Sequence, residues 1–219
     1  EMNTQEQARF NMVEQQIRPW QVLDPQVLAV LSNVQRELFV PQAYQAVAYT
    51  DVEIPLGHGQ DMTPPRIDAR LMHDLHLTGT EKVLEIGTGS GYMTALLAAR
   101  AQRVVSLEVN ADIAATARSN LQHAGVTNAE VRVADGAQGA SADAPFDAIV
   151  LGGSVAEVPQ ALLQQLKVGG RLLAIVGQDP AMSAVLYTRT DETNWSSKAL
   201  WDSVIARLQG FTEPSRFHF

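Results

Sequence analysis

The residues of this chain that could do chemistry gather where an apolar run ends in a glycine-rich turn. Residues 83–91 read VLEIGTGSG, which predicts a buried strand that leads through closely spaced glycines into a helix. Glycine is needed in such a turn because a side chain would block the close approach of the backbone to a ligand or forbid the dihedral angles of the turn. Ligands of open α/β sheets bind beyond the carboxyl ends of the strands, so this turn is the first candidate for a binding site.

The spacing of these glycines distinguishes between nucleotide cofactors. A dinucleotide-binding turn requires G-x-G-x-x-G, but after Gly87 and Gly89 the third required position holds Tyr92, and glycine comes one residue early at Gly91. The E-x-G-x-G-x-G pattern instead resembles the first motif of class I methyltransferases, which bind S-adenosyl-L-methionine. That resemblance implies that Glu85 belongs to the network around the methionine amino group. For this motif alone, a tight strand-to-helix turn without a ligand is the alternative.

Two further acids follow the next two predicted strands. Glu108 ends RVVSLEV, where a carboxylate can accept hydrogen bonds from both ribose hydroxyls of a nucleoside. Asp135 closes AEVRVAD, where methyltransferases commonly place an acid against the adenine amino group. The alternatives are an exposed acid for Glu108 and an ordinary Asp-Gly turn for Asp135. Together, three such sites at strand ends favour a nucleoside cofactor, and the predicted cofactor-binding residues are Glu85, Gly87, Thr88, Gly89, Ser90, Gly91, Glu108, Val109, Asp135 and Gly136.

The elements that must position these residues alternate between strands and helices. Strand-like segments at 82–87, 103–109, 129–135, 146–153 and 171–177 are separated by helix-like segments around 96–97, 111–124 and 162–166. This alternation predicts an α/β fold, a Rossmann-like class I methyltransferase with a doubly wound, mostly parallel sheet and helices on both faces. The tail, with SAVLYTRT and then KALWDSVIARL, is expected to add edge strands or a final strand and helix.

The segment before this core predicts an N-terminal helical cap and a long loop. Apolar residues recur at helical spacing over residues 1–45, with a break at Arg18-Pro19. Residues 41–65 lose this period and gather proline and glycine, which is typical of a connecting loop. Thr63 before two prolines predicts a helix over about 64–77 with Thr63 as its N-cap.

Composition limits the class of protein. Hydrophobic residues make up 46% and charged residues 18% of the chain, a globular balance without an apolar run long enough to span a bilayer. The net charge of −8 disfavours a nucleic-acid partner, and the absence of cysteine excludes disulfides and thiolate metal sites. No metal site is expected, because His73, His76, His123 and His218 lack ligand spacing with paired acids. A polar N-terminus predicts a soluble, cytoplasmic protein without membrane association.

A longer set of motifs, covering roughly residues 12–177, resembles the protein-L-isoaspartate O-methyltransferase family. The matching segments are MVEQQIR at 12–18, FVP at 39–41, YTD at 49–51, GHGQ at 57–60, the turn at 83–91, APFD at 144–147 and GGRL at 169–172. The resemblance implies a protein-repair enzyme that methylates the free carboxylate of isoaspartyl peptides, with S-adenosyl-L-methionine as cofactor and S-adenosyl-L-homocysteine as product. It also implies one methyltransferase domain over 1–219, with a helical cap and acceptor loop at about 1–62 and a Rossmann-like core and C-terminal edge at about 63–219.

The acceptor loop of that family reads G-x-G-Q-T-I-S, with the final serine at the active site. Residues 57–63 read GHGQDMT, so the resemblance implies Thr63 as the catalytic position and His58, Gln60, Asp61, Met62 and Gly152 as acceptor-binding residues. An ionised carboxylate needs no general base at neutral pH, so a hydroxyl that positions the acceptor suffices. A pure helix N-cap is the alternative for Thr63, and a solvated loop residue is the alternative for His58.

Two departures from the family pattern leave the acceptor open. Asp61 replaces a neutral threonine and should repel an anionic acceptor in a partly desolvated site, whereas the helix N-terminus that follows should attract it. Gly152 replaces the first residue of a usual Thr-Ala-Ala and removes a side chain expected to face the acceptor. The leading hypothesis is therefore an isoaspartyl-type O-methyltransferase acting on a peptide or protein carboxylate. The alternatives are a methyltransferase with another acceptor, such as a small molecule, and a non-catalytic cofactor-binding module, and the sequence gives no oligomeric state.

Overall fold

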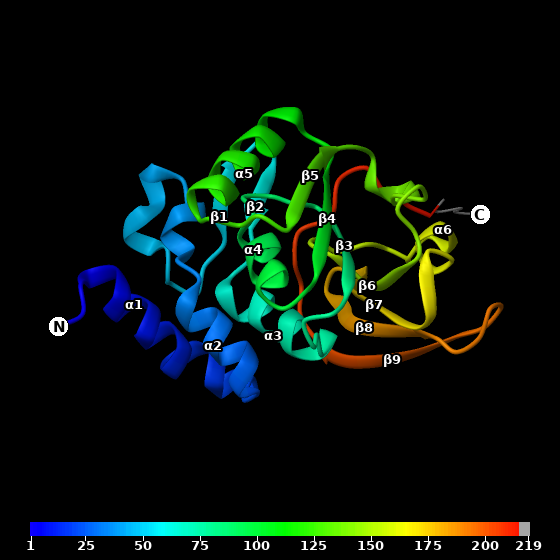
Figure 1. Cartoon of the computed structure of the whole chain (residues 1–219), viewed down its shortest axis with the longest axis horizontal. Coiled ribbons are helices and arrows are strands. Elements are labelled where there is room, and N and C mark those ends of the chain that lie inside the picture. Colours follow the sequence, from blue (N-terminus) through cyan, green and yellow to red (C-terminus); the bar gives the residue numbers. More distant parts are fainter. Residues whose placement is uncertain (215–219) are drawn as a thin grey trace.

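The computed structural model describes residues 1–214, and its central element is a seven-stranded sheet with the order β5-β4-β3-β6-β7-β8-β9 (Figure 1). The first five strands in this order run parallel, whereas β8 and β9 are added antiparallel at one edge. Because the strand order reverses between β3 and β6, the carboxyl ends of these strands flank the switch point. The strands are β3 (Lys82–Ile86), β4 (Arg103–Glu108), β5 (Ala129–Val133), β6 (Phe146–Leu151), β7 (Leu166–Gln178), β8 (Ala181–Arg189) and β9 (Trp195–Asp202).

Alternate residues of the parallel strands enter two separate hydrophobic clusters. Val83 and Val104 belong to a cluster shared with helices α3 (Pro65–Leu75), α4 (Tyr92–Ala99) and α5 (Ala111–His123). Their neighbours Leu84 and Val105 belong to the second cluster, with the short helix α6 (Gln160–Leu163) and irregular segments. Burial of both faces is the condition for a parallel sheet. The predicted α/β, mostly parallel, Rossmann-like fold is confirmed, although its longer core helices lie on one face.

The predicted helical cap consists of short helices that pack against that same face. Buried residues of the cap, such as Ile17 and Leu31, belong to the cluster that contains α3 and α4. The break predicted at Arg18-Pro19 coincides with a 3-10 turn that ends at Gln21 in a left-handed conformation. The elements of the cap are α1 (Thr4–Met12), the π-helical turn η1 (Val13–Ile17), and η2 (Arg18–Trp20), α2 (Pro25–Asn33), η3 (Arg36–Phe39) and η4 (Gln42–Val47), with α1 and α2 beside the N-terminus in Figure 1.

The predicted long loop contains a β-hairpin, which the sequence reading did not anticipate. β1 (Ile54–Gly57) pairs antiparallel with β2 (Gln60–Met62). Between them, His58 and Gly59 have φ angles of 53° and 73°, and positive φ at both central residues matches the right-handed twist of a tight hairpin. The irregular mixture of proline and glycine concealed this hairpin, because β1 and β2 are too short to establish an alternating pattern.

Helix α3 begins two residues after Thr63, so the prediction of Thr63 as its N-cap is wrong. The N-cap position is Pro64, and no side chain caps this helix end. With prolines at 64 and 65, Arg66 would be the first residue able to donate a backbone N–H to a Thr63 cap, and the Thr63 side chain makes no such bond. The Thr63 hydroxyl instead donates a hydrogen bond to the carboxylate of Asp68, at an Oγ1–Oδ1 distance of 2.9 Å.

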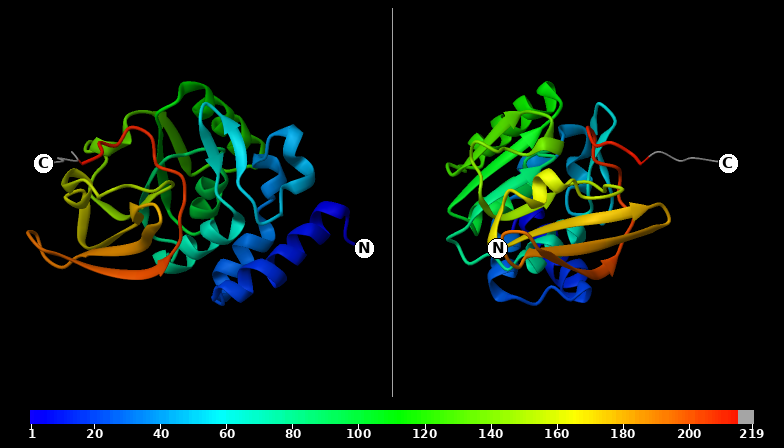
Figure 2. Two further views of the ribbon diagram at one scale, coloured as in Figure 1. Left: turned by 180° about the vertical axis from the view of Figure 1, so that it is seen from behind. Right: turned by 90° about the vertical axis from the view of Figure 1, so that its right-hand side faces the viewer.

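The tail forms edge strands, and the alternative of a final helix is wrong. Residues 198–202 of the KALWD segment continue β9, which pairs with β8 through most of its length. Trp195 and Trp201 anchor this edge by donating indole hydrogen bonds to the Leu163 carbonyl and the Asp74 carboxylate. Beyond β9, residues 204–211 leave the sheet and run past the β1–β2 hairpin, as the red segment of Figure 2 shows. His218 lies outside the described residues.

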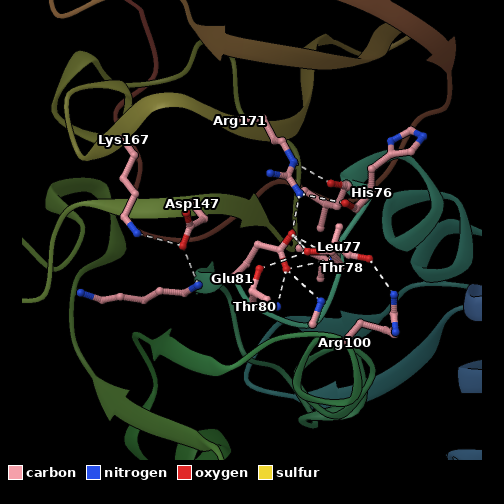
Figure 3. Close-up of polar contacts among 12 residues, drawn as sticks. His76, Leu77, Thr78, Thr80, Glu81, Arg100, Asp147, Lys167 and Arg171 are labelled. Atoms are coloured by element: carbon pink, nitrogen blue, oxygen red, sulfur yellow. Dashed lines mark hydrogen bonds and ion pairs between the residues drawn. The ribbon is translucent and has the colours of Figure 1, made fainter.

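Acidic side chains fix the start of the core at the amino ends of β3 and β6 (Figure 3). Glu81 accepts hydrogen bonds from the backbone N–H groups of Thr78, Gly79 and Thr80 and pairs with Arg171 at 3.3 Å. Arg171 also donates to the Leu75 carbonyl at the end of α3, so this pair ties helix, turn and strand together. Burial by itself would raise the pKa of Glu81, but these donors outweigh it and hold the pKa below its usual value.

Within residues 1–214, no helix combines the length and the apolar character needed to cross a bilayer.

Candidate active site

The glycine-rich turn lies at the switch point between β3 and β6. Gly87, Gly89 and Gly91 all have positive φ, at 93°, 56° and 91°, which side chains rarely tolerate. A Cβ added at Gly89 would meet only the Leu56 side chain, at 3.5 Å, so this glycine borders the open side of the turn. At Gly91 a Cβ would press on Leu121 of α5 at 3.3 Å. Gly91 therefore serves the packing of α4 on α5, while Gly89 leaves room beside the turn.

The carboxyl group of Glu85 lies beneath this turn and is completely buried. Its Oε1 accepts hydrogen bonds from the hydroxyls of Thr94 and Ser106, and Thr88 pairs with the same Ser106 at 2.6 Å. Its Oε2 has no hydrogen-bond partner among residues 1–214. Burial raises the pKa of Glu85 to about 8, although the two hydroxyls act against this. Glu85 is thus a buried carboxyl group with one oxygen, Oε2, left free.

Glu108, at the end of β4, connects the turn to the hairpin. It is 1% exposed, its Oε1 accepts from the Gly89 N–H at 3.1 Å, and its Oε2 accepts from the Asn110 N–H at 3.0 Å. The same Oε2 accepts a hydrogen bond from the Gln60 side chain at 3.0 Å. Gln60, Gly89 and Glu108, which sequence reasoning assigned to two different ligands, thus lie in contact.

Three further predicted cofactor residues lie just beyond the ends of β5 and β4. Asp135 is exposed and accepts a hydrogen bond from the Ala137 N–H at 3.1 Å, which makes it the cap of a 3-10 turn, η5 (Gly136–Gln138). Gly136 is buried, and a Cβ there would come within 2.1 Å of Ile86, so this position requires glycine for packing. Val109 is 42% exposed beside Glu108.

Two small cavities meet between the turn and the hairpin. One, of about 60 Å³, is lined by Gln60, Asp61, Thr63, Gly87 and Gly152 together with residues 206–209. The other, of about 50 Å³, shares Asp61, Thr63, Gly87, Gly89 and Gly152 and adds Asp68 and Tyr92. Gly152 and Gly87 are in direct contact, since a Cβ on Gly152 would lie 2.7 Å from the Gly87 carbonyl oxygen. The structure thus brings the predicted acceptor residues Gln60, Asp61, Met62, Thr63 and Gly152 to the glycine-rich turn.

His58 lies apart from these two cavities. It faces a larger cavity of about 250 Å³, which is walled by Phe39, Pro41 and Ile113 and borders Gly89 and Ser90. Its Nε2 lies 3.7 Å from the exposed Asp112 carboxylate at the start of α5.

Two residues that contact Thr63, Arg36 of the cap and Asp68 of α3, were not identified from the sequence. Arg36, which is fully buried, donates through Nη2 to the Thr63 carbonyl at 3.1 Å and pairs through Nη1 with Asp68 at 3.4 Å. Its guanidinium lies 4.6 Å from the ring centroid of Tyr92, whose hydroxyl has no hydrogen-bond partner among the described residues. One signal was available: Asp68 falls on the apolar face of its helix, one turn from Leu71 and Met72.

The C-terminal segment was also missed, and it covers the site. Ser154 holds it by accepting a hydrogen bond from the Leu208 N–H at 2.8 Å and donating one to the Ile205 carbonyl at 3.0 Å. Gln209 then donates to the His58 carbonyl and accepts from Gln60. A Cβ on Gly87 would lie 2.7 Å from the Leu208 side chain, so Leu208 rests directly on the turn. Residues up to Leu208 fit the strand-and-helix pattern expected for the tail, and nothing local in the sequence shows that they pack against the distant Ser154 and Gly87.

Comparison with known proteins identifies a relationship that covers nearly the whole chain. The sequence profile described as protein-L-isoaspartate(D-aspartate) O-methyltransferase matches residues 7–205. A protein-L-isoaspartate O-methyltransferase of Methanoculleus marisnigri is 50% identical over 169 residues, which is 77% of each chain. One of Syntrophus aciditrophicus is 42% identical over 191 residues, which is 87% of this chain and 88% of the relative.

Solved structures agree on the fold. A crystal structure of a Plasmodium falciparum chain described as a protein-L-isoaspartate O-methyltransferase, in complex with S-adenosyl-L-homocysteine, superposes with a TM-score of 0.78 at 20% identity. The superposition covers 96% of this chain and 100% of that one.

Proposed function

This chain belongs to the protein-L-isoaspartate(D-aspartate) O-methyltransferase family, and we propose that it methylates the free carboxylate of isoaspartyl residues in peptides and proteins. It is an S-adenosyl-L-methionine-dependent O-methyltransferase with a Rossmann-like core. The observation that supports this acceptor best is the junction of the hairpin with the glycine-rich turn, where Thr63, Gln60 and Gly152 border the same cavities as Gly87. A methyl donor at the turn and an acceptor at the hairpin would there be neighbours.

The residues at the turn fit the cofactor in three respects. Gly89 has no side chain to block the open side of the turn. Glu108 places a buried carboxylate at the end of β4, the strand next to β3. The free Oε2 of Glu85 is a buried polar atom that a cationic amino group would satisfy. We assign the cofactor's methionine end to Glu85 and Gly87, its ribose to Glu108 and its adenine to Val109, Asp135 and Gly136.

In this reaction the protein itself forms no covalent bond to the acceptor or to the methyl group. The bound cofactor supplies an electrophilic methyl group on a sulfonium and is converted into S-adenosyl-L-homocysteine. The acceptor carboxylate is ionised at neutral pH, so no base has to remove a proton from it. Thr63 and Gln60 therefore act by holding a carboxylate oxygen in line with the methyl carbon, and such positioning can supply much of the rate enhancement.

One observation favours a second candidate function, in which the acceptor is not a carboxylate. Three acids line the two cavities: Asp68 is paired with Arg36, whereas no salt bridge is found for Glu53 or Asp61 among the described residues, and the lining cation Arg207 is paired with Glu213. In a partly desolvated site this excess of negative charge opposes an anionic acceptor. An amine or hydroxyl acceptor on a small molecule would be tolerated better.

Methyl incorporation into a synthetic peptide with one internal isoaspartyl residue tests the proposal, with the matching aspartyl peptide as control. We expect methyl ester formation on the isoaspartyl peptide alone. The variant Asp61→Thr should raise kcat/KM, because it removes a like charge from the acceptor side. Absence of product from folded, cofactor-saturated wild-type protein and from this variant would exclude the isoaspartyl acceptor and leave the second candidate.

A further inference from the structure

The hydroxyl of Thr63 has a partner that the proposed reaction does not use. Its Oγ1 donates to Asp68 Oδ1 at 2.9 Å, and both side chains border the cavity of about 50 Å³ next to Gly87 and Gly152. Asp68 is 7% exposed and comes from the first turn of α3, five residues beyond Thr63. The hydroxyl assigned to the acceptor is thus in contact with a buried carboxyl group.

Arg36 prevents this pair from rearranging freely. Its Nη1 binds Asp68 Oδ2 at 3.4 Å, its Nη2 binds the Thr63 carbonyl at 3.1 Å, and its Nε binds the Ala48 carbonyl at 2.7 Å. One fully buried guanidinium therefore fixes both the backbone of Thr63 and the free oxygen of Asp68. The Oδ1 of Asp68 is left facing Thr63.

The protonation state of Asp68 determines what Thr63 can offer to the cavity. An ionised carboxylate only accepts hydrogen bonds, so the Thr63 hydroxyl must donate its one hydrogen bond to Asp68. It then presents only lone pairs to the cavity. A neutral Asp68 can donate its own proton to Thr63 Oγ1, which frees the threonine proton to turn toward the cavity. An acceptor carboxylate also has only lone pairs, so it gains a hydrogen bond in the second arrangement alone.

We propose that Asp68 is a positioning residue that sets the direction of the Thr63 hydroxyl and thereby admits an acceptor carboxylate only when Asp68 is neutral. The inference rests on the proposed function, because it takes Thr63 as the group that meets the acceptor.

The surroundings of Asp68 make the neutral form accessible. Burial raises the pKa of Asp68 to about 6, and the Arg36 charge and the Thr63 hydroxyl work in the opposite direction. Two other buried titratable groups lie near enough for Asp68 to raise their pKa values, namely Glu85 from β3 and Tyr92 from α4. Arg36 from η3 is the cation that faces it.

The pH dependence of turnover on the isoaspartyl peptide tests the inference. The peptide carboxyl is ionised above pH of about 5, so its own titration does not interfere. Wild-type kcat/KM should fall by about tenfold for each pH unit above the pKa of Asp68, because the neutral fraction falls by that factor. Asp68→Asn always donates an amide proton to Thr63, so its kcat/KM should stay level from pH 6 to pH 8 and exceed the wild-type value at pH 8. Thr63→Ala should be slow at every pH.

Asp74→Asn is the matched control, since Asp74 is also buried on α3 but pairs with Arg70 and Trp201. It should keep the wild-type pH profile. A profile of Asp68→Asn that parallels wild type would overturn the inference. Weaker binding of S-adenosyl-L-homocysteine to Asp68→Asn, with the pH profile unchanged, would assign Asp68 to the cofactor instead and would overturn it as well.

A titration of the Asp68 carboxyl carbon by NMR separates this inference from the proposed function. Thr63→Val removes the hydrogen bond that stabilises the ionised form, so the pKa of Asp68 should rise. An unchanged pKa would reject the coupling even in a protein that methylates the peptide. If wild type methylates no isoaspartyl peptide at any pH, the proposed function fails, and this titration alone then decides whether Asp68 controls Thr63.

Discussion

Glu108 is a residue at which the cofactor assignment can be tested by removing a single charge. Its carboxylate accepts from Gly89, Asn110 and Gln60, so within residues 1–214 its negative charge is balanced by three neutral donors and by no cation. Hydrogen bonds to a charged group contribute about 1.5–3 kcal/mol, and ribose hydroxyls would add two of them. Glu108→Gln should therefore weaken binding of S-adenosyl-L-homocysteine by roughly tenfold or more, as measured by titration calorimetry.

The control for this prediction is Glu130→Gln, one strand further along the sheet. Glu130 is exposed and pairs with Arg103 and Arg132 on the surface. Its replacement should leave the affinity unchanged. Equal affinities for the wild type and Glu108→Gln would remove Glu108 from the cofactor site.

Glu85 should make the stability of the ligand-free protein depend on pH. Its pKa is raised from 4.5 to about 8 by burial, so the folded state holds a proton that the unfolded state has lost between these values. Stability must then decrease as pH rises through this window, by up to about tenfold in the folding equilibrium for each pH unit. Glu85→Gln is neutral at every pH. In urea unfolding it should match wild type near pH 5 and exceed it at pH 8, whereas a constant difference across this range would contradict the prediction.

The residues proposed for the cofactor carry local sequence signals, which the residues that support the acceptor loop lack. Glycine spacing and acids at strand ends are local signals, and they placed Gly89 and Glu108 where the structure has them in contact. Arg36 and Asp68 are separated by 32 residues in the chain and meet only through the packing of the cap on α3. No local sequence pattern around either residue predicts that their side chains are in contact, so only the structure showed that they support Thr63.

At the scale of elements, we propose that the segment 204–211 controls access to the Gly87 side of the turn. The cavities beneath it hold about 60 and 50 Å³, whereas pockets for ligands of nucleoside size are roughly 300 Å³ or larger. A cofactor that occupies these two cavities would therefore require Leu208 and Gln209 to move away from Gly87 and Gln60. Leu208→Ala removes the side chain that lies against Gly87, while Ile205 still anchors the segment in the core, so S-adenosyl-L-homocysteine should dissociate roughly tenfold faster in stopped-flow displacement.

Val204→Ala is the comparison variant, because Val204 lies in the same segment but is 46% exposed. It should release the ligand at the wild-type rate. Equal rates for Leu208→Ala and wild type would show that the segment does not limit exchange.

Helices and strands were predicted correctly where their hydrophobic pattern extended over enough residues. The parallel strands were predicted from apolar, β-branched runs, because burial on both faces leaves such runs uninterrupted. The hairpin of β1 and β2 was not, since strands of four and three residues carry almost no pattern. In the tail, residues 198–202 fit helix and strand equally well, and pairing with β8 decided between them.

For the whole molecule, we propose that cap and core form one domain. Leu31 of α2, Ile54 of β1 and Leu96 of α4 belong to one hydrophobic cluster, and the Arg36–Asp68 pair crosses the boundary near residue 62 that the sequence indicated. Breaking a buried ion pair by removing one partner costs about 3–5 kcal/mol, a large share of a typical domain's stability. The cap therefore has few ways to unfold while the core stays intact.

This arrangement predicts a single unfolding transition. Trp20 lies at the end of η2 in the cap, and Trp195 begins β9 at the far edge of the sheet, so each reports on one part of the chain. In variants that keep only one of these two tryptophans, with Trp201 also replaced by phenylalanine, fluorescence should follow the same urea midpoint as far-ultraviolet circular dichroism. Arg36→Met should lower both midpoints equally, because the ion pair stabilises cap and core as one unit. Two separate midpoints in the tryptophan variants that keep Arg36 would show that cap and core unfold as independent units. The position of the Thr63 hydroxyl would then depend on docking of the cap onto the core.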